Sequence, residues 1–335
     1  MTTASSAAAR TAVHLADGRE LLYFDDVPGL DRGAPDPRPL PPHRPRPELR
    51  RDEVFDEWIA VAAHRQTRTF LPAEGACPLC PGGPGSEIPA PDYHVAIFEN
   101  RFPSLGGPAG GRCEVVCFTD DHDASFAGLA DDRLATVARA FTDRTRELGR
   151  LPGVEEVFVF ENRGVEIGAT LTHPHGQIYA FPYVTPKARQ VLAHEECALC
   201  ADVAREASGE RVVAADEHFV AYVPYAARWP YQVRIVPRRH VPDLPALGEE
   251  LAVELMGLYA ETLRRFDGLF PGTVPYLACW HQAPTGARDR AHLWVEIFTP
   301  RRTADKLKYL ASVESGAGAF ITDVAPEDAA ARLRA

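Results

Sequence analysis

One pattern of two cysteines followed by two histidines occurs twice in the chain. The first copy contains Cys77, Cys80, His122 and His173, and the second contains Cys197, Cys200, His240 and His292. The second Cys and the first His are 42 residues apart in one copy and 40 in the other, and the two His are 51 and 52 residues apart. Repetition at nearly constant spacing indicates an internal duplication, in which each half folds so that four distant side chains meet.

Two thiolates and two imidazoles are the ligands of tetrahedral zinc sites. We therefore predict a zinc site for the first set and a second zinc site for the other. The alternative for the second set is a relic whose thiols pack as small apolar groups. Closed four-ligand coordination leaves no open position for catalysis, so the predicted role of the metal is structural.

The two copies differ immediately after their last metal ligand. The first reads His173-Pro-His175-Gly-Gln177, whereas the second reads His292-Leu-Trp294-Val-Glu296. Residues two apart on a strand share a face, so His175 and Gln177 are expected to point the same way. A neutral imidazole with one nitrogen fixed by a backbone carbonyl is a good nucleophile toward phosphorus. The alternative for a His-x-His pair is a metal pair or core packing, and Trp294 excludes the same chemistry from the second half.

Strand and helix patterns occur in the same order in both halves. In the first half we expect strands at 56–62, 94–98 and 114–118, a helix at 131–148, and strands at 154–160 and 177–183. In the second half we expect strands at 218–223 and 233–236, a helix at 247–266, and strands at 276–280 and 294–298. This order predicts an α+β fold of duplicated domains, each with an antiparallel sheet and one long helix.

The chain length of 335 residues suits two domains of about 150 residues each. The segment 1–47 is rich in Pro, Arg and Asp and is predicted to be a tail or extended arm. Residues 48–186 are predicted to form the catalytic N-terminal domain, and residues 187–335 a degenerate C-terminal domain.

Charge and composition exclude several classes of protein. The formal net charge of −11 argues against a nucleic-acid partner. The sequence contains no run of about 20 apolar residues, so we predict no membrane span. The N-terminus has no apolar signal core. Seven cysteines, four of them in the Cys-x-x-Cys pairs, fit metal-bound thiolates better than a disulfide framework. We therefore expect a cytoplasmic protein.

Several motifs together resemble the galactose-1-phosphate uridylyltransferase family of the histidine-triad superfamily. They are Cys77-Pro-Leu-Cys80, Cys117-Phe-Thr-Asp-Asp-His122, Phe160-Glu-Asn162-Arg-Gly164, His173-Pro-His175-Gly-Gln177, Trp229-Pro-Tyr231 and Lys306-Leu-Lys308. The resemblance extends over residues 50–333. Gln177 marks the transferase branch, because histidine-triad hydrolases usually carry a histidine there.

The resemblance implies a two-step exchange of UMP between UDP-glucose or UDP-galactose and hexose 1-phosphates, with His175 as the nucleophile. It also implies nucleotide or phosphate contacts and a homodimer, across which the arginines act. The implied contact residues are Arg65, Arg68, Asn100, Asn162, Thr170 and Gln177. Lys308 and Glu314 match positions that contact the hexose phosphate, although a surface Lys and Glu are usually only solvated.

The chain departs from the family pattern in its second half. Some members bind iron there through a Glu and several His; His281 is kept, but Trp294 and Glu296 replace two expected histidines. We therefore do not expect an iron site. Two alternatives to galactose-pathway uridylyl transfer stay open: a related nucleotidyltransferase or phosphorylase with another sugar phosphate or nucleotide, and a zinc-stabilised nucleotide-binding protein without catalysis.

Overall fold

The structure is a computed structural model that describes residues 10–67, 72–73 and 75–335. The chain divides into two compact units. Unit 1 comprises Met1–Val159 and Thr170–Pro186, and unit 2 comprises Phe160–Ala169 and Lys187–Ala335. The sequence prediction assigned residues 160–169 to the N-terminal domain, whereas they group with unit 2. The other predicted boundary, between residues 186 and 187, stays a prediction.

Unit 1 is built on a sheet with the strand order β1-β2-β5-β6-β8-β7. Its strands are β1 (Arg10–His14), β2 (Glu20–Phe24), β5 (Val95–Glu99), β6 (Arg112–Cys117), β8 (His175–Phe181) and β7 (Glu156–Arg163), the last of which ends in unit 2. Neighbouring strands from β1 to β8 in this order are antiparallel. A separate hairpin consists of β3 (Glu48–Asp52) and β4 (Glu57–Val61), followed by the 3-10 helix η1 (Ala63–Thr67).

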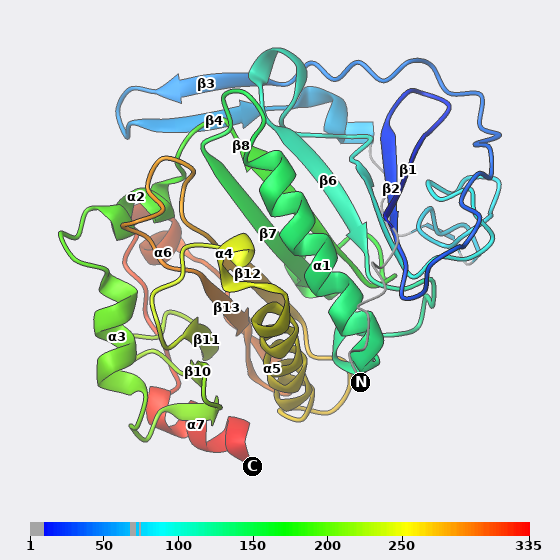
Figure 1. The fold of residues 1–335 in the computed structure, drawn as a ribbon. Helices are drawn as coiled ribbons and strands as arrows, with labels where there is room; N and C mark the ends of the chain where they lie inside the picture. The colour runs from blue at the N-terminus through cyan, green and yellow to red at the C-terminus, as the bar shows by residue number, and fades with distance from the viewer. Residues whose placement is uncertain (1–9, 68–71, 74) are drawn as a thin grey trace. The chain divides into compact units, whose positions relative to one another are not determined.

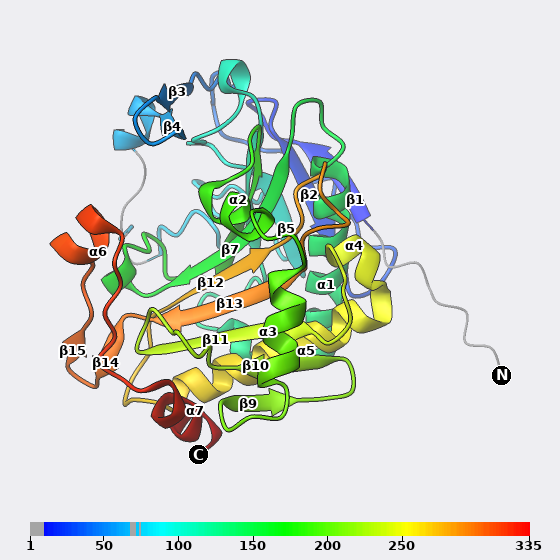
Figure 2. The ribbon, with the colours of Figure 1, turned by 90° about the vertical axis from the view of Figure 1, so that its left-hand side faces the viewer.

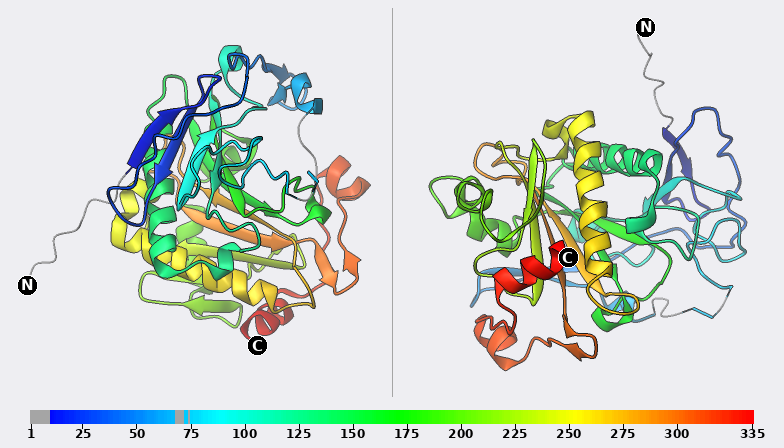
Figure 3. Two further views of the ribbon diagram at one scale, coloured as in Figure 1. Left: turned by 90° about the vertical axis from the view of Figure 1, so that its right-hand side faces the viewer. Right: turned by 90° about the horizontal axis from the view of Figure 1, so that it is seen from below.

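The segment expected to be an N-terminal arm carries two of these strands. β2 pairs with β5, and β1 adds to its outer side at the edge of the sheet (Figure 3). Leu21, Leu22 and Tyr23 are each at most 1% exposed, because both faces of β2 are covered. The arm prediction therefore differs from the structure at residues 10–24, while residues 25–47 form no helix or strand. The short apolar run of β2 was not recognised as a strand, because the residues after it are rich in proline and arginine.

Helix α1 (Asp131–Leu148) covers one face of the unit 1 sheet (Figure 1). Leu134, Val137 and Phe141, apolar residues at helical spacing in this segment, are buried. Asp131 and Asp132 in the first turn complement the positive end of the helix dipole. The helical spacing thus predicted both the bounds and the buried face. The loops between strands also contain the short 3-10 helices η2 (Gly107–Ala109), η3 (Phe126–Gly128) and η4 (Val165–Ile167).

Unit 2 contains a sheet with the order β12-β13-β11-β10-β9. Its strands are β9 (Val212–Ala215), β10 (Phe219–Tyr222), β11 (Tyr231–Pro237), β12 (Tyr276–His281) and β13 (Trp294–Thr299). Its helices are α3 (Ala198–Glu206), α4 (Leu244–Leu247), α5 (Glu249–Asp267), α6 (Ser312–Ala317) and α7 (Pro326–Arg334), and α2 (Pro186–Leu192) precedes them. A small hairpin of β14 (Arg301–Thr303) and β15 (Lys306–Leu307) follows β13.

Helices cover both faces of the unit 2 sheet. α5 lies along one face and α3 along the other (Figure 3). α3 contributes Leu199 and Val203 to a cluster with Tyr222, Val236 and Trp294 from the strands. α7 lies beside β9 (Figure 2). The sheet core of unit 2 is therefore closed by α3 and α5 on its two faces, and α7 packs beside its edge strand β9.

The two sheets repeat one strand order. β5-β6-β8-β7 in unit 1 corresponds to β10-β11-β13-β12 in unit 2, and the long helix lies between the second and third of these strands in the chain in both units. The prediction of an α+β fold with duplicated antiparallel sheets and long helices is confirmed. Among the described residues, no helix has both the length and the apolar composition needed to cross a bilayer.

Candidate active site and metal centres

The first Cys and His set comes together in unit 1. The ligand atoms of Cys77, Cys80, His122 and His173 all lie within 4.8 Å of one another. The Cys80 sulfur is 3.3 Å from Nδ1 of His122 and 3.6 Å from Nδ1 of His173. The loop holding the thiols, the end of β6 and the start of β8 meet here, although they are far apart in sequence.

Hydrogen bonds on the far side of both imidazoles orient them for a metal. Nε2 of His173 lies 2.8 Å from the carbonyl oxygen of Thr119, and Nε2 of His122 lies 3.0 Å from the Thr172 hydroxyl. A carbonyl oxygen only accepts, so the His173 proton is on Nε2 and Nδ1 presents a lone pair to the thiols. Burial lowers the pKa of His173 to about 4, which keeps the ring neutral. The donor set therefore fits a cation that prefers sulfur and nitrogen.

The paired thiols also favour a cation. Burial, together with the adjacent Cys77, raises the pKa of the Cys80 thiol to about 11. Two thiolates side by side repel each other unless a positive ion lies between them.

The second set comes together in unit 2. The ligand atoms of Cys197, Cys200, His240 and His292 also lie within 4.8 Å of one another. The Cys200 sulfur is 3.5 Å from Nδ1 of His240 and 3.4 Å from Nδ1 of His292. Burial and the adjacent Cys197 raise the pKa of Cys200 to about 11. The chain thus has two Cys and His clusters with the composition and spacing for metal binding.

His175 begins β8, two residues beyond the ligand His173. Its Nδ1–H donates to the backbone oxygen of His173 at 2.8 Å. This bond fixes the tautomer, because the carbonyl cannot donate, and it leaves the lone pair on Nε2. Burial lowers the pKa of His175, which favours the neutral imidazole. The strand therefore holds the ring in one orientation, with Nε2 unprotonated.

Gln177 lies two residues along β8 from His175. Both side chains line a cavity of about 130 Å³ in unit 1. The Asn100 amide donates to Oε1 of Gln177 at 3.3 Å, which directs the Gln177 N–H groups away from Asn100. Arg65, Asn100 and Thr170 line the same cavity. The sequence therefore predicted five residues that the fold brings together in one hollow.

Arg65 is held at the rim of this cavity. Its guanidinium donates to the carbonyl oxygen of Phe102 at 3.2 Å and to the Tyr179 hydroxyl at 3.3 Å. The other predicted phosphate-binding arginine, Arg68, lies outside the described residues.

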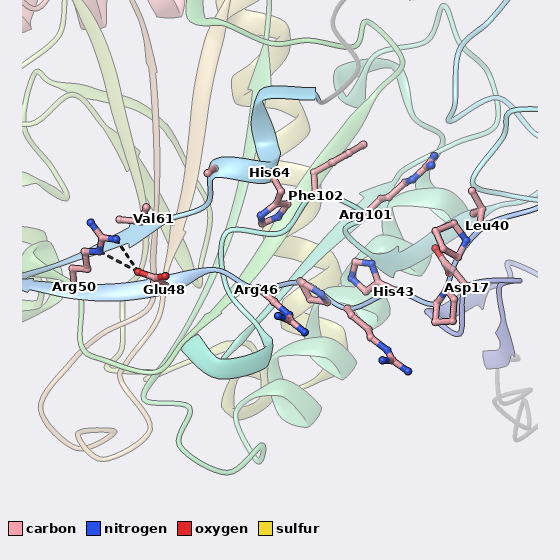
Figure 4. Close-up of a pocket in the computed structure, with 15 residues that line it drawn as sticks. Asp17, Leu40, His43, Arg46, Glu48, Arg50, Val61, His64, Arg101 and Phe102 are labelled. Atoms are coloured by element: carbon pink, nitrogen blue, oxygen red, sulfur yellow. Dashed lines mark hydrogen bonds and ion pairs between the residues drawn. The ribbon is translucent and has the colours of Figure 1, made fainter.

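A larger hollow of about 540 Å³ adjoins the cavity and shares Arg101 and Phe102 with it (Figure 4). His43, Arg46 and His64 line it, together with the other arginines of residues 44–50. Its lining carries four arginines against two carboxylates, Asp17 and Glu48, so it extends the anion-attracting surface outward from His175.

The remaining predicted site residues belong to unit 2. Asn162 is half-buried on β7. Lys308 is 6% exposed; its ammonium donates to the carbonyl oxygens of Arg228 and Ile321 and lies 3.7 Å from Glu314. Lys308 is therefore a buried, hydrogen-bonded lysine and not a solvated one.

Sequence reasoning missed the residues that support the site from behind. Tyr93, whose hydroxyl lies 2.8 Å from Nε2 of His173, Thr119 and Thr172 orient the imidazoles. Leu79 and Phe98 form apolar cavity walls. Of these, Leu79 lies inside the Cys-x-x-Cys motif and Thr119 inside the motif from Cys117 to His122; the others act through contacts that form only on folding.

Fold and site define a protein of two duplicated α+β units, in which a neutral imidazole lines a cavity beside a Cys and His cluster. The family model for the N-terminal domain of galactose-1-phosphate uridyl transferase matches residues 106–185, and that for the C-terminal domain matches residues 177–335. The chain is 45% identical to the galactose-1-phosphate uridylyltransferase of Streptomyces lividans over 97% of each chain. It therefore belongs to the galactose-1-phosphate uridylyltransferase family, whose members are nucleotidyltransferases.

Two further relatives span most of the chain. The galactose-1-phosphate uridylyltransferase of Thermotoga maritima is 40% identical over 86% of this chain and 98% of its own. A solved uridylyltransferase structure superposes with a TM-score of 0.76 at 32% identity, covering 86% of this chain and 97% of its own. The predicted family, its enzymatic class and its place in galactose metabolism are thus confirmed.

Proposed function

We propose that the chain exchanges UMP between UDP-glucose and galactose 1-phosphate through a covalent uridylyl-His175. The observation that carries this proposal is the His175 ring, which is fixed by its Nδ1–H bond to His173 and lines the cavity beside Gln177. Family membership indicates UDP-hexoses and hexose 1-phosphates as the substrates.

In the first step, Nε2 of His175 attacks the α-phosphorus of UDP-glucose. A nitrogen–phosphorus bond forms, the bond between that phosphorus and the bridging oxygen breaks, and glucose 1-phosphate leaves with the electron pair. In the second step, a phosphate oxygen of galactose 1-phosphate attacks the same phosphorus and His175 leaves. One site serves both sugar phosphates in turn, so ping-pong kinetics are expected.

Gln177 would donate to a phosphoryl oxygen that gains charge in both steps. An amide does so without exchanging a proton with water, unlike a histidine at this position. Asn100 supports this role because it holds the Gln177 carbonyl oxygen. We assign a phosphate-contacting role to Arg65 and Arg68, and nucleotide contacts to Asn100, Asn162 and Thr170.

The donor is larger than the cavity that contains His175. Ligand pockets usually measure about 300–1,000 Å³, against about 130 Å³ here. The adjoining basic hollow would take the remainder of the molecule, with Arg101 at the junction (Figure 4). Lys308 and Glu314 are proposed to contact the hexose phosphate, as the family motif implies.

We assign zinc to the cluster of His173 and, with the same ligand types, to the cluster of His292. Zinc in the first cluster would fix the segment that starts β8, and no chemical step needs it. In each cluster two imidazoles present Nδ1 to a thiol, which supports this assignment.

We also propose a homodimer. The β3–β4 hairpin exposes a group of large apolar side chains whose exposed fractions range from 42% to 82%: Val54, Phe55, Trp58 and Ile59. A second copy of the chain covering this hairpin would remove them from water and would bring the η1 segment with Arg65 near an interface.

The intact mass of the protein, measured after mixing with UDP-glucose and no acceptor, tests the transfer mechanism. Wild type is expected to gain one UMP, and His175→Ala to gain none while keeping its metal content and melting temperature. The exposed His14 on β1 offers a matched control, because His14→Ala removes an imidazole from the same unit without touching the cavity. Chasing the adduct with galactose 1-phosphate should restore the unmodified mass.

An adduct that persists in His175→Ala would show that another residue is the nucleophile. A wild type that forms no adduct with UDP-glucose but does so with another nucleotide sugar would favour a related nucleotidyltransferase or phosphorylase. Failure with every donor, with metal and fold intact, would favour a nucleotide-binding role.

A further inference from the structure

Unit 2 has its own cavity, of about 290 Å³. Its lining includes Leu199 and Asp202 from α3, Arg234 from β11, and Trp294 and Glu296 from β13. The uridylyl-transfer mechanism uses none of these residues.

This cavity is the counterpart of the one that contains His175. Leu199 stands in its Cys-x-x-Cys motif where Leu79 stands in the first, and each lines its own cavity. Val115 is paired with Gln177 across β6 and β8, and Arg234 is paired with Glu296 across β11 and β13. The two units therefore have a cavity at equivalent positions, but the cavities are lined by different side chains.

Trp294 occupies the position of the nucleophile. It is 5% exposed, and its ring stacks on His281 with 4.2 Å between centroids. Among the residues that the structure describes, none accepts a hydrogen bond from its Nε1–H. An indole nitrogen only donates, and buried donors are normally paired, so a ligand oxygen in the cavity would satisfy this group.

Cations outnumber carboxylates around the cavity. Glu296 accepts from Lys187 and, at 2.7 Å, from Gln232, while Asp202 lies 2.8 Å from both Arg205 and Arg234. These ion pairs use both carboxylates of the lining.

Arg228 supplies a further positive charge at the rim. Its guanidinium lies over the Phe320 ring, 5.0 Å from the centroid, and in the described part of the chain no carboxylate pairs with it. The cavity lining therefore has a net positive charge. It also contains two carboxylates, Asp202 and Glu296, whose positions are fixed by ion pairs.

We propose that the unit 2 cavity binds a phosphorylated sugar without transforming it. The phosphate would pair with Arg228 and the other cations, the sugar hydroxyls would donate to Glu296 or Asp202, and one ligand oxygen would accept from Nε1 of Trp294. The lone pair of the indole nitrogen belongs to the aromatic π system and is not available for attack on phosphorus, so the ligand would leave unchanged. The volume suits a ligand of this size, at the lower end of the usual range for pockets.

Glucose 6-phosphate is a suitable probe, because its phosphate is not on the anomeric carbon and the proposed transfer reaction does not use it. Titration calorimetry on the full chain should detect binding. Trp294→Phe, which keeps an aromatic ring and removes the donor, and Arg228→Gln, which keeps a polar side chain and removes the charge, should each weaken binding about tenfold. Arg264→Gln, on the exposed face of α5, is the charge-matched control, and Asn100→Ala tests the other cavity; both should bind as wild type does.

An indole ¹⁵N–¹H spectrum locates the contact directly. The chain has four tryptophans, and the Trp294 resonance is the one missing from Trp294→Phe. Addition of glucose 6-phosphate should shift that resonance most. The proposal is overturned if the probe does not bind, if it binds to both variants as to wild type, or if Asn100→Ala abolishes binding. None of these readouts depends on UMP transfer, so the outcome is independent of the proposed function.

Discussion

His173 and His175, two residues apart in the chain, are proposed to bind a metal and to act as the nucleophile. His173 presents Nδ1 to the Cys80 sulfur, whereas His175 uses Nδ1 to bind the backbone of His173 and keeps Nε2 available. Nδ1 faces the thiol in His173 but is bound to the backbone in His175. The difference arises because the Thr119 carbonyl holds Nε2 of His173, whereas the His173 carbonyl holds Nδ1 of His175. The hydrogen bonds thus support the different roles that the sequence motif predicts for the two histidines.

Gln177 provides the residue-scale prediction. Gln177→Glu keeps the shape of the side chain but replaces a donor with a negative charge beside the phosphate. The rate of adduct formation from UDP-glucose should fall by about 100-fold or more, as for the loss of one donor to a developing oxyanion. Rapid-quench measurement of the adduct, with circular dichroism to verify folding, checks this. A rate within threefold of wild type would remove Gln177 from the proposed mechanism.

At the scale of elements, a buried carboxyl on β7 connects three elements of unit 2. Glu161 accepts from the Tyr276 hydroxyl of β12 at 2.6 Å and from the Tyr259 hydroxyl of α5 at 2.8 Å. Burial raises the pKa of Glu161 to about 7, although both tyrosines oppose this. The carboxyl is therefore partly protonated near neutral pH in the folded chain and ionised in the unfolded chain.

This raised pKa predicts a pH-dependent stability. The contribution of Glu161 is fully present below its unfolded pKa of about 4.5 and is lost as the pH rises to about 7, because the unfolded state then binds fewer protons. The loss amounts to about 3 kcal/mol at most. Urea unfolding at pH 5 and pH 8 should show a smaller decrease for Glu161→Gln than for wild type. Equal decreases would show that the folded carboxyl titrates normally.

At the scale of the whole molecule, duplication gave two units with the same strand order and the same four-ligand cluster but different neighbouring chemistry. In unit 1 the cluster adjoins His175, and in unit 2 it adjoins Trp294. The clusters hold loops and strand ends that are distant in sequence, so a bound metal would stabilise each unit by constraining its unfolded chain as well as through ligand bonds.

Metal content per chain tests this duplication. Wild type is expected to contain two zinc ions, and Cys77→Ser and Cys197→Ser should each lose about one. Each should also lower the melting temperature by about 5–10 °C, because zinc binding is coupled to folding. Cys113→Ser, a buried thiol outside both clusters, should keep both ions. A Cys197→Ser protein with unchanged metal content would identify the second cluster as a relic.

Local patterns in the sequence determined much of the fold and of the site. Apolar spacing predicted α1 over 131–148, and the repeated motif predicted both Cys and His clusters as well as His175 and Gln177. The helix could be predicted because its apolar spacing is a local pattern. The clusters could be predicted because the same motif occurs twice. The segment before residue 25 was predicted as part of an arm, because a two-stranded edge has no signal stronger than its proline-rich surroundings.

Tertiary structure alone decided which atoms are available for chemistry. The carbonyl of Thr119 and the hydroxyls of Tyr93 and Thr172 orient the imidazoles, and Lys308 is buried where a solvated residue was the simplest expectation. That Nε1 of Trp294 has no acceptor in the described part of the chain is likewise visible only after folding. Sequence specifies which groups are present; distances of about 3 Å between residues far apart in the chain decide which of them are paired, because hydrogen bonds act only at that range.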